Sequence, residues 1–155
     1  MRLSELFREV EFDGSIKNDA DINLVTDDSR LVRPGSLFVC IRHRSFDGHT
    51  AALDALASGA AAVVTQDRLG LENELRVADS RSAYARLCAA LCNHPERKLR
   101  LIGVTGTNGK TTVTTLIRNI LSDSGTKTLL TGTVCNRLGD ENLPSGLTTP
   151  TPPAL

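Results

Sequence analysis

The residues best suited to chemistry form a glycine-rich stretch, Gly103-Val-Thr-Gly-Thr-Asn-Gly-Lys-Thr-Thr112. Its small residues allow backbone N–H groups to turn inward around phosphate oxygens. A helix that begins at Lys110 adds the positive end of its dipole, the Lys110 ammonium group can reach β- and γ-phosphates, and the Thr111 hydroxyl can bind Mg²⁺. The stretch departs from GxxxxGK[ST], because Val104 stands at the first glycine position. We interpret it as a phosphate-binding loop, the alternative being a glycine-rich turn with an incidental lysine.

Three other polar segments are candidates for ligand binding. The segment 26–30 (Thr-Asp-Asp-Ser-Arg) follows an apolar run, and strand ends are where α/β sheets bind ligands, although a solvated turn has the same composition. The segment 42–49 contains two arginines, two histidines and one phenylalanine, which suits either an anionic ligand or an exposed loop closed by an Asp-Gly turn. The segment 147–153 is rich in threonine and proline, which suits a linker better than a phosphate contact.

The elements around the glycine-rich stretch are predicted as one βαβ unit. Apolar residues 99–105 predict a strand, residues 110–124 a helix ended by Gly125, and residues 127–131 a second strand. The remaining residues, rich in Gly and Pro, predict no further strand or helix. About 57 residues cannot complete a nucleotide-binding α/β domain, so we expect this chain to be the front of a longer protein.

The first part of the chain is predicted to be an α/β domain over residues 1–94, with helices packed on a partly parallel sheet. Apolar residues at helical spacing open the chain, and short apolar runs at 22–26, 37–41, 61–64 and 75–77 predict strands. We expect Thr50 to cap a helix that stops at Gly59. We expect Asp79 or Ser80 to cap a second helix that reaches Asn93. The polar residues 93–98 predict a domain boundary, and the second domain, 99–155, begins there.

Composition narrows the possible functions. Eighteen basic and 18 acidic residues give no net charge, so no field favours a nucleic acid or an anionic membrane. No charged-then-apolar leader and no apolar stretch of membrane-spanning length is present, which predicts a cytoplasmic protein. The four cysteines form no CxxC pair and are expected to be buried, reduced thiols. We also expect a monomer.

The motifs occur together in one order that resembles the Mur ligase family, and within it the ligases that make the UDP-N-acetylmuramoyl-tripeptide. The resemblance spans nearly the whole chain. It is carried by Asp28-Ser-Arg, Pro34-Gly-Ser-Leu-Phe-Val, Asp47-Gly-His, Gly59-Ala, Thr105-Gly-Thr-Asn-Gly-Lys-Thr-Thr and Thr148-Thr-Pro.

The resemblance implies a front domain for a UDP-linked substrate, the start of an ATPase domain, and ATP and Mg²⁺ as cofactors. In the family, ATP phosphorylates the D-Glu carboxylate of UDP-N-acetylmuramoyl-L-Ala-D-Glu, and a diamino acid, meso-diaminopimelate or L-lysine, attacks the acyl phosphate. By position, the resemblance makes Lys110 catalytic and Thr111 a metal ligand. It assigns ATP binding to Gly106, Thr107, Asn108, Gly109, Lys110, Thr111 and Thr112. It assigns the UDP-sugar to Asp27, Ser29, Arg44, Ser45, Phe46, Thr148 and Thr149.

Other interpretations remain open at this stage. The neighbouring Mur ligase that adds D-Ala-D-Ala shares the front-domain pattern, but the Gly132-Thr133 pair together with Thr148-Thr-Pro favours the tripeptide-forming ligase. A stand-alone UDP-sugar-binding module and a general P-loop NTPase with a sensor domain are the alternatives from other classes. On any of these interpretations the 155 residues alone are expected to be inactive as a ligase.

Overall fold

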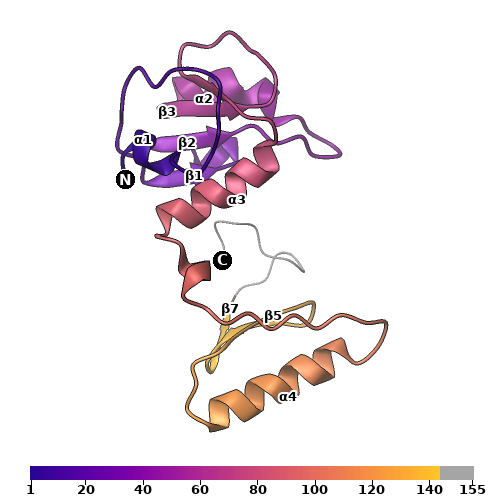
Figure 1. The fold of residues 1–155 in the computed structure, drawn as a ribbon. Coiled ribbons are helices and arrows are strands. Elements are labelled where there is room, and N and C mark those ends of the chain that lie inside the picture. The colour runs from indigo at the N-terminus through magenta and orange to yellow at the C-terminus, as the bar shows by residue number, and fades with distance from the viewer. Residues whose placement is uncertain (144–155) are drawn as a thin grey trace. The chain divides into compact units, whose positions relative to one another are not determined.

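The structure, a computed structural model, describes residues 1–143 (Figure 1). The chain divides into two compact units, one spanning Met1–Lys98 and one that begins at Leu99. Among the described residues, no helix is both long and apolar enough to cross a bilayer. Each unit is described by itself.

The first unit is built on a sheet of four parallel strands in the order β1-β2-β3-β4. The chain passes through α1 (Leu3–Leu6), β1 (Leu24–Thr26), η1 (Ser29–Leu31), β2 (Ser36–Val39), η2 (Gly48–Ala51), α2 (Ala52–Ala57), β3 (Ala60–Thr65), β4 (Glu74–Arg76), α3 (Ser80–Leu91) and η3 (Pro95–Arg97). The predicted α/β class is confirmed, and every strand pair in this sheet is parallel.

Both faces of this sheet are covered, because successive side chains of a strand point to opposite faces. Leu37 and Val39 of β2 lie in a core with residues of α1 and α3, whereas Phe38 and Cys40 lie in a second core with the alanines of α2. Figure 1 shows α3 and α2 on opposite sides of the strands. The continuous apolar run of β2, buried at each of its four positions, therefore suits a strand between two helical layers.

The predicted N-cap residue is correct for α3 and wrong for α2. The Asp79 carboxylate accepts hydrogen bonds from the backbone N–H groups of Arg81 and Ser82, so Asp79 is the cap of α3. Thr50 does not cap α2: it lies inside η2, whose cap is Asp47. The short 3-10 turn leads directly into α2 and replaces the cap that the sequence suggested.

The second unit differs from its prediction at two places. Helix α4 (Lys110–Asp123) and strand β5 (Leu129–Thr131) are present, but residues 99–105 form no strand, since no described segment offers them hydrogen-bonding partners. Strand β5 instead pairs antiparallel with β6 (Asn136–Leu138), which pairs with β7 (Glu141–Leu143). The β6–β7 hairpin was not predicted; Gly139, at φ 55°, begins its two-residue turn and is the signal that was missed.

The cysteines are free, but not all of them are buried. Cys40 and Cys88 are buried, and burial raises the pKa of each thiol to about 12, so both remain protonated. Cys92 is exposed and Cys135 is half-buried, which corrects the expectation of four buried thiols. Cys92 is the C-cap residue of helix α3.

Candidate functional site

The loops of the first unit that carry candidate residues gather at one edge of the sheet. Because all four strands run parallel, the segments after β1, β2, β3 and β4 emerge at the same, carboxyl edge. These segments include Asp27 and Ser29 after β1, and Arg44, Ser45 and Phe46 after β2. The sheet therefore brings together the five substrate residues that were predicted in this unit.

The loop after β1 is ordered by its own acidic residue. Asp28 caps η1 by accepting a hydrogen bond from the backbone N–H of Arg30 at 3.0 Å. The Arg30 guanidinium also donates to both Asp28 oxygens, at 2.8 and 2.6 Å, and this contact lowers the pKa of the Asp28 carboxyl. Asp28 and Arg30 thus form an ion pair. Half-buried Ser29 is the first residue of the 3-10 turn η1.

The loop after β2 is a narrow excursion with an exposed tip. The backbone N–H of His43 donates to the carbonyl of Phe46 at 2.8 Å, and the Arg42 guanidinium contacts Asp47 at 3.1 Å across the base of the loop. Arg44 and Ser45 are exposed, and Phe46 is half exposed. An accessible aromatic ring beside a cation and a hydroxyl is suited to a planar, anionic ligand such as a nucleotide.

The glycine that follows this loop is required by packing. A Cβ at Gly48 would lie 2.8 Å from the backbone nitrogen of Ile41, because the chain returns closely beside the end of β2. The Gly48 N–H donates to the Ile41 carbonyl at 2.9 Å. A tight Asp-Gly turn was one of the two interpretations left open by the sequence; in the structure Asp47 caps η2 and Gly48 permits a close backbone contact.

A buried histidine fixes the far side of the same loop. His49 Nε2 accepts a hydrogen bond from the backbone N–H of Gln66 at 3.1 Å, so its proton is on Nδ1, which donates to Asp47 at 2.6 Å. The backbone N–H of His49 and then its ring lower the pKa of Asp47 to about 2. His49 therefore ties the loop after β2 to the end of β3. The sequence had placed His49 in a polar loop and in the Asp47-Gly-His motif, but gave no sign of its contact with Gln66.

Sequence reasoning also missed Tyr84, which lies in the first half of α3. Its hydroxyl donates to Asp27 Oδ1 at 3.1 Å, and His43 Nε2 lies 3.4 Å from Asp27 Oδ2. Tyr84 has 2% of its surface exposed. Its signal in the sequence was its place as the chain's single tyrosine on the buried side of a predicted helix.

The glycine-rich loop of the second unit leads into α4 as predicted. Gly109 is the N-cap residue of α4 at φ 78°, a conformation that favours glycine, and Gly106 adopts φ 147°. The Lys110 ammonium group donates to the carbonyl oxygens of Gly106 and Thr107. The lysine therefore already lies over the loop on which phosphate would sit. Thr107, Asn108, Thr111 and Thr112 are exposed.

This loop fits a nucleoside triphosphate with its cation. The first-turn N–H groups of α4 have no partners within the helix and can donate to phosphate, and Lys110 supplies positive charge beside them. The Thr111 hydroxyl, in the exposed first turn, is an oxygen ligand of the kind that Mg²⁺ takes together with phosphates. The described residues contain no group of three His, Cys, Asp or Glu side chains for a metal. Predicted ligands Thr148 and Thr149 lie outside the described residues.

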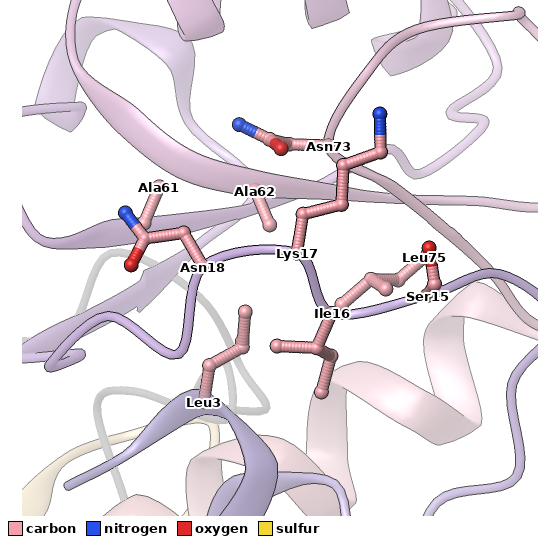
Figure 2. Close-up of a pocket in the computed structure, with 9 residues that line it drawn as sticks. All are labelled: Leu3, Ser15, Ile16, Lys17, Asn18, Ala61, Ala62, Asn73 and Leu75. Carbon is pink, nitrogen blue, oxygen red and sulfur yellow. The ribbon is translucent and has the colours of Figure 1, made fainter.

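A small cavity in the first unit is separate from this edge. It lies beside Ala61 and Ala62, at the amino end of β3, and the side chains of Lys17, Asn18 and Asn73 surround it (Figure 2). Its free space accepts about one water molecule. It offers no room for a substrate.

Both units match models of the same protein family. The model described as "Mur ligase family, catalytic domain" matches residues 21–94, and the "Mur ligase middle domain" matches residues 104–155. The chain belongs to the Mur ligase family. The two matches follow one another in the order that the motifs had suggested.

Two similar relatives are named for the same ligase reaction. The UDP-N-acetylmuramoyl-L-alanyl-D-glutamate–2,6-diaminopimelate ligase of Listeria monocytogenes is 38% identical over 97% of this chain, and that of Geobacillus kaustophilus is 47% identical over 84%. The chain spans 31% and 27% of the length of these two relatives.

Solved structures show the same fold. A UDP-N-acetylmuramoyl-L-alanyl-D-glutamate–2,6-diaminopimelate ligase matches 89% of this chain with a TM-score of 0.69 at 29% identity, and this chain covers 28% of it. The MurF ligase of Thermotoga maritima in complex with ADP matches 64% with a TM-score of 0.50 at 28% identity, with 23% of that chain covered.

Proposed function

We propose that this chain is the substrate- and nucleotide-binding front part of an ATP-dependent ligase that joins 2,6-diaminopimelate to UDP-N-acetylmuramoyl-L-Ala-D-Glu in the cytoplasm. The observation that carries the proposal is the 38–47% identity, over most of this chain, with ligases named for this reaction. The names of these relatives specify 2,6-diaminopimelate, which favours diaminopimelate over L-lysine as the amino acid that is added.

The first unit would hold the UDP-sugar at the carboxyl edge of its sheet. The loop Arg44 to Phe46 is exposed there, and Ser29 and Asp27, both half-buried, belong to the same edge. Arg44 supplies positive charge for a diphosphate, and the half-exposed ring of Phe46 supplies a stacking surface for a base. Thr148 and Thr149, outside the described residues, are proposed as further contacts to the UDP-sugar.

The second unit would hold ATP on residues 106–112. The terminal D-Glu carboxylate attacks the γ-phosphorus and releases ADP; the amine then attacks the acyl carbon, loses a proton and displaces phosphate. Lys110 would stabilise negative charge on the transferring phosphoryl group, for which it must leave the carbonyls of Gly106 and Thr107. Mg²⁺ held with Thr111 would neutralise phosphate charge.

The ligase that adds D-Ala-D-Ala is the second candidate, because its structure from Acinetobacter baumannii also matches the fold. That match covers 77% of this chain with a TM-score of 0.56 at 26% identity, below the 89% and 0.69 of the diaminopimelate ligase. The more extensive likeness supports the diaminopimelate assignment.

Removal of the Lys110 ammonium group tests the proposal in the full-length ligase. We expect Lys110→Ala to lower ligation by at least about 100-fold, since it removes a charge that stabilises the transition state, while the affinity for the UDP-sugar in calorimetry stays unchanged. Lys127→Ala, at an exposed lysine after α4, is the matched control and should retain activity. Full ligation by Lys110→Ala, or absence of diaminopimelate-dependent ADP release by the unmodified enzyme, would refute the proposal.

A further inference from the structure

The carboxylate of Asp27 connects three segments that are separate in the sequence. Its Oδ1 accepts the Tyr84 hydroxyl from α3 at 3.1 Å, and its Oδ2 lies 3.4 Å from His43 Nε2 in the loop after β2. Asp27 itself directly follows β1. Each carboxylate oxygen thus faces a group from a different segment, and 21% of the Asp27 side chain is exposed.

The Tyr84 side of this contact is rigid. The Tyr84 ring lies in the core between the sheet and α3, and burial together with the nearby Asp27 charge raises the pKa of its hydroxyl. The hydroxyl therefore remains protonated and donates its single hydrogen to Asp27. A donor fixed in a packed core determines where the Asp27 carboxylate points.

The His43 side of this contact is exposed. His43 is 45% exposed in its side chain and begins the turn that ends at Phe46, to which its backbone N–H is bonded. A constraint on the His43 ring is therefore a constraint on the tip residues Arg44 and Ser45, which are exposed. The geometry transmits the fixed position of Asp27 to the tip of this loop.

A carboxylate is also poorly suited to contact the diphosphate of the ligand directly. Asp27 carries negative charge and accepts hydrogen bonds only, so a diphosphate close to it would be repelled. Both its oxygens already face protein groups. We propose that Asp27 and Tyr84 are positioning residues, which hold the His43–Phe46 loop in place for the UDP-sugar through the contact of Asp27 with His43. The proposal rests on the proposed function of this edge.

Binding of UDP-N-acetylmuramoyl-L-Ala-D-Glu to the 155-residue chain, followed by amide NMR, tests this arrangement. Tyr84→Phe keeps the buried ring and removes only the hydroxyl, so the fold should persist. We expect the dissociation constant to rise about three- to tenfold, the range that loss of one hydrogen bond gives. The free-state shifts of residues 43–46 should move as well.

Ser4→Ala is the matched control. The Ser4 hydroxyl donates to the Asp19 carboxylate at 2.9 Å, ahead of β1, so its loss removes the same kind of bond away from the carboxyl edge. Ser4→Ala should leave the dissociation constant and the shifts of residues 43–46 unchanged. Asp27→Ala should weaken binding, and adding Tyr84→Phe to it should change nothing more, because both act through one contact.

The outcomes separate the inference from the proposed function. No binding of the UDP-sugar by the unmodified chain at millimolar concentration would count against the function itself. Normal binding by Tyr84→Phe, or effects of Tyr84→Phe and Asp27→Ala that multiply in the double variant, would overturn the inference; the second result would make Asp27 a direct ligand. Asp27→Asn, which keeps an acceptor for Tyr84 but removes the charge facing His43, should give an intermediate dissociation constant.

Discussion

The two units differ in how completely their helices are packed. In the first unit, α3 buries residues such as Leu87, which is fully inaccessible, against the sheet. In the second unit, α4 has no buried residue, and its apolar residues Val113, Leu116 and Ile120 are 43%, 55% and 68% exposed. Among the described residues, α3 therefore buries its apolar face against a sheet, whereas the apolar face of α4 is left exposed.

This difference bears directly on the two candidate sites. The loops at the carboxyl edge of the first unit rest on a sheet that is covered on both faces, so their positions follow from a packed core. The loop at residues 106–109 precedes a helix that packs against little else in the described part of the chain. A site is held rigidly only when its supporting elements are packed, so we expect ordered substrate loops and a less ordered nucleotide loop in this chain.

The largest expected effect compares leucines on the two helices. Leu87→Ala should lower the free energy of unfolding of the first unit by about 2–5 kcal/mol, because it leaves a cavity in a closed core. Leu116→Ala, the matched change on α4, should alter stability by no more than about 0.5 kcal/mol, since its side chain is already half exposed. Urea titration followed by amide NMR signals of β2 and α4 reports on each unit. Equal losses would abolish the contrast.

The half-buried carboxylate of Glu74 gives the next effect. Glu74 accepts backbone hydrogen bonds from residues 69–71 and one from the Thr65 hydroxyl. Burial by itself would raise the pKa of Glu74, but these bonds lower it below 4.5 overall. Glu74→Gln should therefore cost about 1–3 kcal/mol at pH 7, because the loop between β3 and β4 loses a charged acceptor.

The sign of the pH dependence follows from the lowered pKa. The stabilisation by Glu74 is fully present above the unfolded value near 4.5 and is lost as the pH falls through the lower folded pKa. The urea midpoints of the unmodified chain and Glu74→Gln should thus converge in acid. Glu72→Gln, at an exposed residue whose partner Lys17 is 3.3 Å away, should have almost no effect at any pH. A constant gap between Glu74→Gln and the unmodified chain would contradict this account.

The smallest effect concerns the segment of chain that leads from the first unit to the second. Arg97 donates to both oxygens of Glu9, at 2.6 and 2.8 Å, so η3 is attached to the first unit. Brief trypsin treatment should cut first after Lys98 and Arg100 and spare Arg97. Glu9→Gln should add cleavage after Arg97, whereas Glu11→Gln should not; mass spectrometry distinguishes the products. Early cleavage after Arg97 in the unmodified chain would show that this attachment is ineffective.

The sequence predicted the elements whose signals are local. Apolar runs located the strands of the parallel sheet, Asp79 located the start of α3, and the glycine-rich loop located α4. The expected strand at residues 99–105 is absent because strand formation needs a neighbour, which apolar residues alone do not provide.

The contacts that arrange the substrate loops were beyond sequence reasoning. Tyr84 and Asp27 are 57 residues apart, and His49 and Gln66 are 17 apart, so neither pair leaves a periodic or adjacent pattern. The residues chosen by the resemblance, Ser29 and Arg44 to Phe46, do lie at one edge, and their roles remain predictions. The side chains that hold these substrate loops in place, such as Tyr84 and His49, can be identified only from the three-dimensional structure.

Tyr84 has one further consequence, for spectroscopy. The chain has no tryptophan and a single tyrosine, so its near-ultraviolet emission comes almost entirely from the residue that contacts Asp27. A nearby carboxylate that accepts the phenol proton quenches tyrosine fluorescence. The natural chain therefore carries an intrinsic optical reporter, and a ligand that draws Asp27 away from α3 would brighten it without any label.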